Sequence, residues 1–278
     1  MSAQDTSNSY DLLKEKEQNE EFERLKRQAS GLIQIERKVW TEVGISPGSK
    51  VLDVGCGSGA ITQELAEHIY PGQVIGTDIS QALLEKGQHA YNQKRNASKT
   101  SAKENLVLTQ GDVYNLPFSK NCFDVVHARF VMQHLSEPSK ALREMWRVLR
   151  PGGILCAIDV DKGWSGLYPE PATSIALDEA IIQKQLSQGG DPWVGRKLSW
   201  YLNNTGFSKV NTDIKLVDSD QIGFAKFLNM LAFGSYKKGS SDKLSVLREK
   251  AQPDIVKLMD STYAWSGFAL FVATGRKQ

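Results

Sequence analysis

The feature that most constrains the fold is the run from Val51 to Gly59, which reads Val-Leu-Asp-Val-Gly-Cys-Gly-Ser-Gly. Apolar residues typical of a buried strand lead into three glycines within five residues, and a helical pattern follows. Glycines permit a tight turn and let a ligand approach the backbone without a Cβ in the way. Free N–H groups at the start of the following helix suit an anionic ligand group. The run therefore predicts a buried strand, a ligand-binding turn and a helix.

Short apolar runs alternate with helical patterns from this segment onward to Asp161. Strands are expected at 50–56, 74–78, 106–108, 122–128 and 154–160, and helices at 59–69, 80–95 and 137–149. Such alternation predicts a parallel sheet with helices on both faces, joined by right-handed crossovers. Residues 21–43 predict a further amphipathic helix ahead of the first strand, because their apolar side chains recur at steps of three and four.

Composition excludes several classes of protein. A formal net charge of +2 provides no strong attraction to nucleic acid, and no apolar run reaches the roughly 18 residues of a membrane span. The polar N-terminus lacks the apolar core of a secretory signal, so a cytoplasmic location is expected. The three cysteines include no C-x-x-C pair, and no His/Asp cluster has metal-ligand spacing, so no metal is expected.

The chain of 278 residues is long enough for one large α/β domain. Residues 1–20 are polar and predict a mobile N-terminal segment, and residues 21–278 form a single domain. Within it, 162–195 and 220–260 are interpreted as insertions that cap the substrate, with 220–260 helical by pattern. A helix is expected at 196–204 and strands at 209–217 and 263–274. Aromatic residues in the caps are candidates for an apolar substrate wall: Trp164, Tyr168, Trp193, Phe224, Phe227 and Phe233.

One acidic residue ends the second expected strand and another follows the third. Asp78 lies where a carboxylate can accept both hydroxyls of a ribose, although a helix N-cap is the alternative. Asp112 could accept from an adenine amino group while Val113 lines the ring, although a turn aspartate is a common alternative. Because ligands bind beyond the carboxyl ends of parallel strands, we expect both acids to lie beside the glycine turn.

These features together resemble the class I S-adenosylmethionine-dependent methyltransferases, especially the ubiquinone/menaquinone-type and natural-product enzymes. The resemblance is carried by 53–59, 78, 111–112, 123–126 and the Leu-Arg-Pro-Gly-Gly of 149–153. It covers residues 20–161 and extends more weakly to the rest. It implies a three-layer α/β Rossmann-like sandwich, with a seven-stranded, mostly parallel sheet whose antiparallel last strand is 263–274. It also implies the cofactor S-adenosylmethionine, the product S-adenosylhomocysteine and a small-molecule acceptor, such as a secondary metabolite or a quinone-like compound.

The same resemblance assigns cofactor contacts. The turn would hold the methionine part, Asp78 the ribose and Asp112 the adenine. Arg24 and Gln28, four residues apart on one helix face, would reach the methionine carboxylate beneath a lid that carries Tyr10. A solvated helix face is the alternative for that pair. The expected contacts are Tyr10, Arg24, Gln28, Asp53, Gly55, Cys56, Gly57, Gly59, Asp78, Ile79, Gly111, Asp112, Val113 and Arg129.

Catalysis would depend mainly on holding a nucleophilic O, N, S or C atom in line with the methyl group. Arg129 would line the sulfonium and substrate end. His134, after the fourth strand, is the candidate general base for an acceptor that needs one, and a bond to a loop carbonyl is its alternative role. Asp159 and Asp161 are weaker candidates. His127, inside the strand, is expected to pack in the core.

Three other functions stay open from sequence. Gly55-x-Gly57-x-x-Ala60 with Asp78 also fits the fingerprint of an NAD(P)-dependent oxidoreductase. The helix before the first strand argues against that class, as does a Tyr-x-x-x-Lys found only at Tyr10–Lys14. A cofactor-binding regulator without catalysis is a second alternative. Nucleic-acid methylation is disfavoured by the low net charge. The chain is expected to act as a monomer or homodimer.

Overall fold

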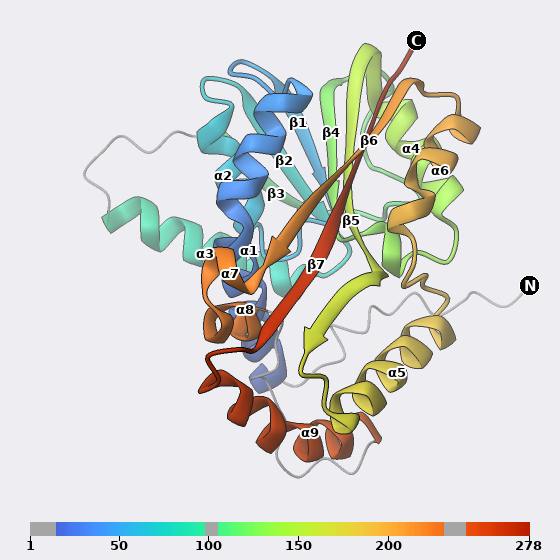
Figure 1. The fold of residues 1–278 in the computed structure, drawn as a ribbon. Helices are drawn as coiled ribbons and strands as arrows, with labels where there is room; N and C mark the ends of the chain where they lie inside the picture. Colours follow the sequence, from blue (N-terminus) through green and yellow to red (C-terminus); the bar gives the residue numbers. More distant parts are fainter. Residues whose placement is uncertain (1–14, 98–104, 231–242) are drawn as a thin grey trace, which may run out of the picture.

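The computed structural model describes residues 15–97, 105–230 and 243–278 (Figure 1). The strands are β1 (Lys50–Val54), β2 (Gln73–Asp78), β3 (Leu106–Gln110), β4 (Phe123–Arg129), β5 (Leu149–Tyr168), β6 (Ser208–Asp218) and β7 (Trp265–Arg276). The α-helices are α1 (Glu15–Val43), α2 (Ala60–His68), α3 (Gln81–Ala97), α4 (Pro138–Val148), α5 (Ala172–Ser187), α6 (Leu198–Thr205), α7 (Ser219–Ile222), α8 (Phe224–Met230) and α9 (Lys243–Met259). Short 3-10 helices occupy Met132–His134 (η1) and Gly195–Lys197 (η2).

The strands form one seven-stranded sheet in the order β3-β2-β1-β4-β5-β7-β6. The neighbours among β1 to β5 are parallel, whereas β7 runs antiparallel to both β5 and β6. This arrangement confirms the predicted seven-stranded, mostly parallel sheet with an antiparallel last strand. Because β7 lies between β5 and β6, the order differs from the 3-2-1-4-5-6 order of dinucleotide-binding sheets.

Helices cover both faces of the sheet. One core, which includes Trp40 and Leu65, packs α1 and α2 against one face, and a second, which includes Leu142 and Leu198, packs α4 and α6 against the other. Figure 1 shows these two helical layers on the left and right of the sheet. Burial on both faces explains why the central strands are almost continuously apolar. The carboxyl ends of the parallel strands meet at one edge, the lower edge in Figure 1.

The helix before the first strand begins earlier than predicted, at Glu15, and ends at Val43 as expected. Its inner face buries Ala29, Leu32, Val39 and Trp40. Gly44 then adopts φ +86°, the left-handed conformation that ends many helices. In the described ranges, no helix has the length and apolar character required to cross a membrane.

The fifth strand differs most from its prediction. The apolar pattern ends at Val160, but β5 continues to Tyr168 and pairs there with the start of β7. The pairing is irregular between Val160 and Ser165, after which Ser165 lies opposite Phe268 and Tyr168 opposite Trp265. Side chains of this extension are largely exposed, so they lack the alternation that marks a half-buried strand. The extension depends on a partner strand that is distant in sequence.

The segments interpreted as substrate caps lie beyond the carboxyl edge of the sheet. The predicted insertion contains α5, and the region expected to be helical contains α7, α8 and α9, with 231–242 outside the described residues. Thr173 Oγ1 on α5 donates to Asp254 Oδ2 on α9 at 2.7 Å. In Figure 1, α5 and α9 lie side by side below the sheet, so the two segments interpreted as caps pack together although they are far apart in sequence.

Candidate functional site

The glycine turn between β1 and α2 has a backbone that only glycine adopts without strain. Gly55, Gly57 and Gly59 have φ values of +66°, +55° and +70°. A Cβ on Gly55 would lie 2.4 Å from Val131 Cγ2, and one on Gly59 would lie 2.9 Å from Leu108 Cδ1. The strand, turn and helix predicted from sequence are all present, and the neighbouring side chains leave no room for larger residues in the turn.

Hydrogen bonds to the end of β2 hold this turn in place. Thr77 O accepts from the N–H groups of Gly55 at 2.8 Å and Cys56 at 3.1 Å. The Asp78 carboxylate accepts from Gly57 N at 2.7 Å through Oδ2 and from Ser80 N at 2.9 Å through Oδ1. Burial raises the pKa of Asp78 above the usual range of an aspartate. Asp78 therefore carries a partly desolvated carboxylate directly beside the turn, where further donors would stabilise its charge.

The loop after β3 joins the same edge. Gly111 N donates to Asp78 O at 2.9 Å, which places Asp112 beside the end of β2. Asp112 Oδ1 in turn accepts from Tyr114 N at 2.8 Å. Val113 is half-buried, and Ile79 is a large apolar side chain that stays 39% exposed. The structure thus brings together two carboxylates and two apolar side chains, which suit a ribose and an aromatic base.

Asp53 lies beneath the turn and is only 2% exposed. Its Oδ2 accepts from Thr62 Oγ1 at 2.7 Å, and its Oδ1 pairs with His127 Nδ1 at 2.8 Å. Because Trp40 Nε1 donates to His127 Nε2 at 3.4 Å, the proton of a neutral His127 belongs on Nδ1. Both carboxylate oxygens of Asp53 are therefore engaged within the protein, and direct contact between Asp53 and a cofactor stays a prediction.

Two further residues of this region are shaped by their surroundings. Desolvation and the neighbouring carboxylates of Asp53 and Asp78 raise the pKa of the half-buried Cys56 thiol well above its usual range, which disfavours the thiolate. His127 is fully buried, in agreement with the expected packing role, but it also links α1 to the turn through hydrogen bonds.

The first helix covers the glycine turn. Leu25 Cδ1 lies 3.3 Å from the position that a Cβ on Gly57 would take. Arg24 and Gln28, on either side of Leu25 in sequence, are half-buried. This placement agrees with a helix over the cofactor, and contact of these two residues with a methionine carboxylate stays a prediction. Tyr10 lies outside the described residues.

A buried ion pair joins α1 to the end of β4. Arg129 Nε donates to Glu36 Oε1 at 2.5 Å, and these side chains are 9% and 1% exposed. The guanidinium also lies 4.1 Å from the ring centroid of Phe130. Sequence reasoning did not single out Glu36, although a signal was present. The apolar stripe of this helix skips one position between Leu32 and Val39, and Glu36 fills it; an acid at a core position requires a buried partner.

The candidate base His134 ends η1, and its side chain is exposed. The loop that carries it is anchored by Asp159, which is fully buried and accepts from Gln133 N at 3.1 Å and Val160 N at 2.9 Å. Burial raises the pKa of Asp159 to about 7. Asp159 therefore holds the loop from below, and proton transfer by His134 stays a prediction.

The aromatic residues expected to wall a substrate pocket have different environments. Phe227 is fully buried and packs on Phe268 with ring centroids 5.7 Å apart. Trp164 and Tyr168 remain 52% and 67% exposed on the β5 extension. Phe233 lies outside the described residues. Within the described ranges, no group of three His, Cys, Asp or Glu side chains is arranged to hold a metal ion.

Comparison with known proteins gives a match over the region just described. Residues 52–157 match a family model described as a methyltransferase domain. An uncharacterized methyltransferase of Schizosaccharomyces pombe is 36% identical over 149 residues, which cover 54% of this chain and 53% of that protein. A demethylmenaquinone methyltransferase of Staphylococcus aureus is 36% identical over 127 residues, 45% of this chain and 49% of that protein. The chain spans about half the length of the curated relatives it matches.

Solved structures share the fold at low sequence identity. The [4+2]-cyclase SpnF superposes with a TM-score of 0.57 at 21% identity, over 87% of this chain and 80% of the cyclase. The YcgJ protein of Bacillus subtilis gives a TM-score of 0.57 at 17% identity, over 88% of this chain and 99% of that protein. The glycine turn and Asp78 thus lie in a region, residues 52–157, that matches a methyltransferase domain, and the chain shares its fold with solved structures such as YcgJ.

Proposed function

We propose that this protein transfers a methyl group from S-adenosylmethionine to an O, N, S or C atom of a small molecule. The observation that carries the proposal is the hydrogen bond from Gly57 N to Asp78 Oδ2 at 2.7 Å. It fixes the carboxylate that would bind the ribose against the glycine turn. S-adenosylmethionine supplies an activated methyl group on a positively charged sulfur, so the protein has to supply position and electrostatics.

The residues of the site fit the three parts of this cofactor. The positive φ values of Gly55, Gly57 and Gly59 give the tight turn that would hold the methionine part. Asp78 would accept the ribose hydroxyls, and Asp112 would accept from the adenine amino group, with Ile79 and Val113 against the ring. Arg24 and Gln28 on α1 would reach the methionine carboxylate from above the turn.

At the reacting end, Arg129 and Glu36 form a buried pair with no net charge. A site that adds no net positive charge there does not oppose a sulfonium. Because water is largely excluded from this pair, its orientation is fixed before an acceptor binds. His134 would take the proton of a phenolic or amide acceptor, whereas a thiolate or free amine needs no base.

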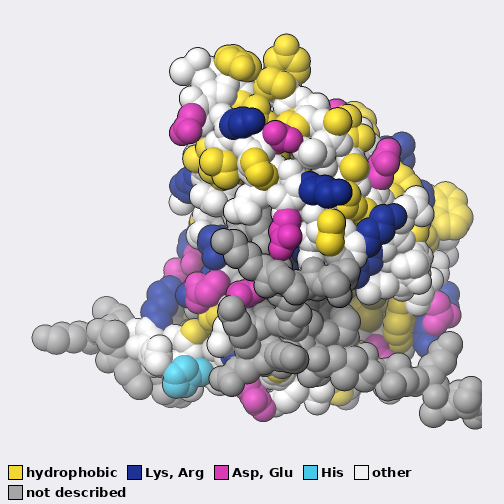
Figure 2. Space-filling model, turned by 90° about the horizontal axis from the view of Figure 1, so that it is seen from below, with side chains coloured by type: hydrophobic (Ala, Val, Ile, Leu, Met, Phe, Trp, Pro, Cys, Tyr) yellow, Lys and Arg dark blue, Asp and Glu magenta, His cyan; other side chains and the backbone are white. Residues whose placement is uncertain are grey.

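Two observations favour a small acceptor, such as a secondary metabolite or a quinone-like molecule. In the described part of the face seen in Figure 2, Lys and Arg side chains lie among Asp and Glu side chains, unlike the basic stripe that nucleic acids require. A demethylmenaquinone methyltransferase is among the similar proteins. The cap formed by α5 and α9, together with the β5 extension, would provide the acceptor contacts.

A second candidate function is binding of the nucleoside without methyl transfer. The specific observation that favours it is the likeness to SpnF, a [4+2]-cyclase, because it associates this fold with a different reaction. The NAD(P) oxidoreductase alternative has no comparable support, since the sheet order departs from the dinucleotide-binding order and the family match is to methyltransferases.

Calorimetry with S-adenosylhomocysteine and with NADH tests the cofactor. We expect the first to bind and the second not to bind. Asp78→Ala should weaken S-adenosylhomocysteine binding at least tenfold, about 1.4 kcal/mol, because the ribose hydroxyls lose their acceptor. Glu85→Ala, which removes an exposed acid on α3, is the matched control and should leave binding unchanged. Unchanged affinity in Asp78→Ala would contradict the ribose assignment.

Transfer itself is tested by turnover of S-adenosylmethionine labelled in its methyl group, with panels of phenols, quinols, amines and thiols. Label that appears in one acceptor class supports methyl transfer and identifies the acceptor atom. Tight binding of S-adenosylhomocysteine without labelled product from any class would support the binding function instead.

A further inference from the structure

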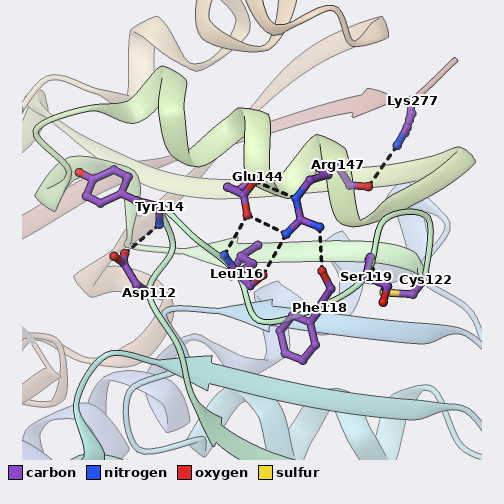
Figure 3. Close-up of polar contacts among 9 residues, drawn as sticks. All are labelled: Asp112, Tyr114, Leu116, Phe118, Ser119, Cys122, Glu144, Arg147 and Lys277. Atoms are coloured by element: carbon purple, nitrogen blue, oxygen red, sulfur yellow. Dashed lines mark hydrogen bonds and ion pairs between the residues drawn. The ribbon is translucent and has the colours of Figure 1, made fainter.

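The loop that carries Asp112 is clamped by two side chains of α4, as Figure 3 shows. Glu144 Oε2 accepts from Leu116 N at 2.9 Å. Arg147 donates to Phe118 O at 2.7 Å through Nη1 and to Leu116 O at 2.9 Å through Nη2. The same guanidinium forms a two-point contact with the Glu144 carboxylate at 2.8 and 2.7 Å. Two charged residues one helical turn apart thus bind three backbone atoms of the loop.

The charges of the clamp are strongly paired. The hydrogen bond from Arg147 holds the pKa of Glu144 below its usual range, and the hydrogen bond to Glu144 raises that of Arg147. Hydrogen bonds between charged groups are shorter and stronger than neutral ones, and a bidentate guanidinium also fixes orientation. The loop backbone between Leu116 and Phe118 therefore has one defined position relative to α4.

The other end of the loop is also attached to α4. Tyr114 Oη accepts from Glu137 N, at the start of the helix, at 3.2 Å. Lys277 fixes the far end of α4, because its Nζ donates to the carbonyl oxygens of Trp146 at 2.8 Å and Leu149 at 2.7 Å. Helix α4 is in this way a support that is attached to Lys277 after β7 and to the loop at Tyr114 and Leu116.

We propose that Glu144, Arg147 and Tyr114 are positioning residues that set the selectivity of the site for adenine over other bases, an inference that rests on the proposed function. They act through Asp112. The hydrogen bond from Tyr114 N occupies Asp112 Oδ1, while Oδ2 has no hydrogen bond to a described residue and can accept from a ligand. Selectivity for a single amino group requires an acceptor held to a fraction of an ångström, which a loosely attached loop does not provide.

The chemical basis of selectivity is the group at position 6 of the purine. Adenine presents an amino donor, which a carboxylate oxygen accepts. Hypoxanthine presents a carbonyl oxygen there, which faces the carboxylate with a second set of lone pairs and leaves it unpaired. A site built around such a donor rejects the analogue that lacks it. If the clamp is removed, the loop can relax, and adenine loses its advantage while hypoxanthine loses little.

The experiment compares the affinities of S-adenosylhomocysteine and S-inosylhomocysteine by calorimetry. The intact protein should prefer the adenine form at least tenfold. Arg147→Met should weaken S-adenosylhomocysteine about tenfold and S-inosylhomocysteine less than twofold, so that the preference is lost. Tyr114→Phe, which removes one hydroxyl, should reduce the preference about threefold and serves as the test if Arg147→Met does not fold. Arg143→Met, an exposed arginine on the same helix, is the control and should leave the preference unchanged.

The outcomes separate this inference from the proposed function. If S-adenosylhomocysteine does not bind the intact protein, the proposed function fails. If it binds but S-inosylhomocysteine binds equally well, the cofactor stands and the assignment of selectivity to this loop is overturned. Equal losses for both ligands in Arg147→Met and Tyr114→Phe would show that the clamp only supports the fold, and would also overturn the inference.

Discussion

The two halves of the candidate site are built in different ways. In the cofactor half, the glycine turn, Asp78 and Asp112 lie at or just after the ends of parallel strands, and loops there are held by hydrogen bonds to the next strand or to α4. In the half proposed to bind the acceptor, α5 contacts α9 and the β5 extension pairs with β7, across long stretches of chain. We therefore expect cofactor binding to depend on short segments of local sequence and acceptor choice to depend on tertiary contacts.

The energetic character of the halves also differs. The cofactor half buries charges with directed partners: both carboxylate oxygens of Asp53 are bonded, and Glu36 is paired with Arg129 through one hydrogen bond. The cap has a small apolar cluster around Leu228, Ile255 and Leu258. Buried, hydrogen-bonded networks resist local opening, whereas a small cluster on exposed helices opens readily. We therefore expect the cofactor half to be rigid before binding and the acceptor half to adjust to its ligand.

The largest effect is expected from Gly55→Ala. The substitution strains a backbone at φ +66° and places a Cβ 2.4 Å from Val131 Cγ2, which displaces the turn. S-adenosylhomocysteine binding, measured by calorimetry, should weaken at least a hundredfold, about 3 kcal/mol. Gly48→Ala is the matched control, because Gly48 has φ +85° but open space around its missing Cβ. Equal affinities in the two variants would show that the turn yields, and the cofactor half would not be rigid.

Much of the cofactor half could be predicted from sequence. The turn of 55–59 encodes its own conformation through positive φ values, and Asp78 and Asp112 follow from their positions after apolar strands. The local sequence pattern does not predict which residue pairs with each buried polar group. His127 is recognisable as a core residue, but its bonds to Trp40 and Asp53 join three elements that only the tertiary structure brings together.

The acceptor half could be predicted much less well. The β5 extension carries no periodic apolar pattern, because its hydrogen bonds come from β7 and its side chains face solvent. The recurrence of apolar residues predicted that the late region is helical, but it did not predict the division into α7, α8 and α9. Contacts between distant segments produce no pattern in the sequence of either segment alone. The region proposed to bind the acceptor therefore has no sequence motif comparable to the glycine turn.

A second test uses the buried carboxyl at the border between the halves. Asp159 has a pKa of about 7 in the folded protein, well above that of an unfolded chain. The native state therefore binds more protons than the unfolded state between these two values, and the free energy of unfolding should fall as pH rises through this window. Between pH 5 and 7 the contribution amounts to about 2 kcal/mol. Urea unfolding at both pH values should show this loss in the wild type and a much smaller loss in Asp159→Asn.

Asp161 provides the opposite case two residues later. Although burial raises the pKa of Asp161, the two-point contact with Arg196 outweighs burial and lowers it. Its stabilising effect is present at neutral pH and is lost as pH falls. Asp161→Asn should therefore change how the free energy of unfolding depends on pH in the acid range, and it should leave the dependence between pH 5 and 7 in place. If Asp159→Asn keeps the wild-type slope, the buried carboxyl is ionised throughout, and the loop that carries His134 is held by a charge.

The smallest effect is expected from Thr173→Val, which removes the hydroxyl that donates to Asp254 and so loosens α5 from α9. The change is nearly isosteric, and the loss of one such hydrogen bond costs about 1 kcal/mol. Hydrogen exchange followed by mass spectrometry should show backbone amides of α5 and α9 exchanging about fivefold faster, because local opening becomes easier. Affinity for S-adenosylhomocysteine should stay within about twofold of the wild type, since the glycine turn and Asp78 are attached to other elements. A parallel loss of cofactor affinity would show that the cap and the cofactor half form one cooperative unit, and acceptor choice could then not vary independently of cofactor binding.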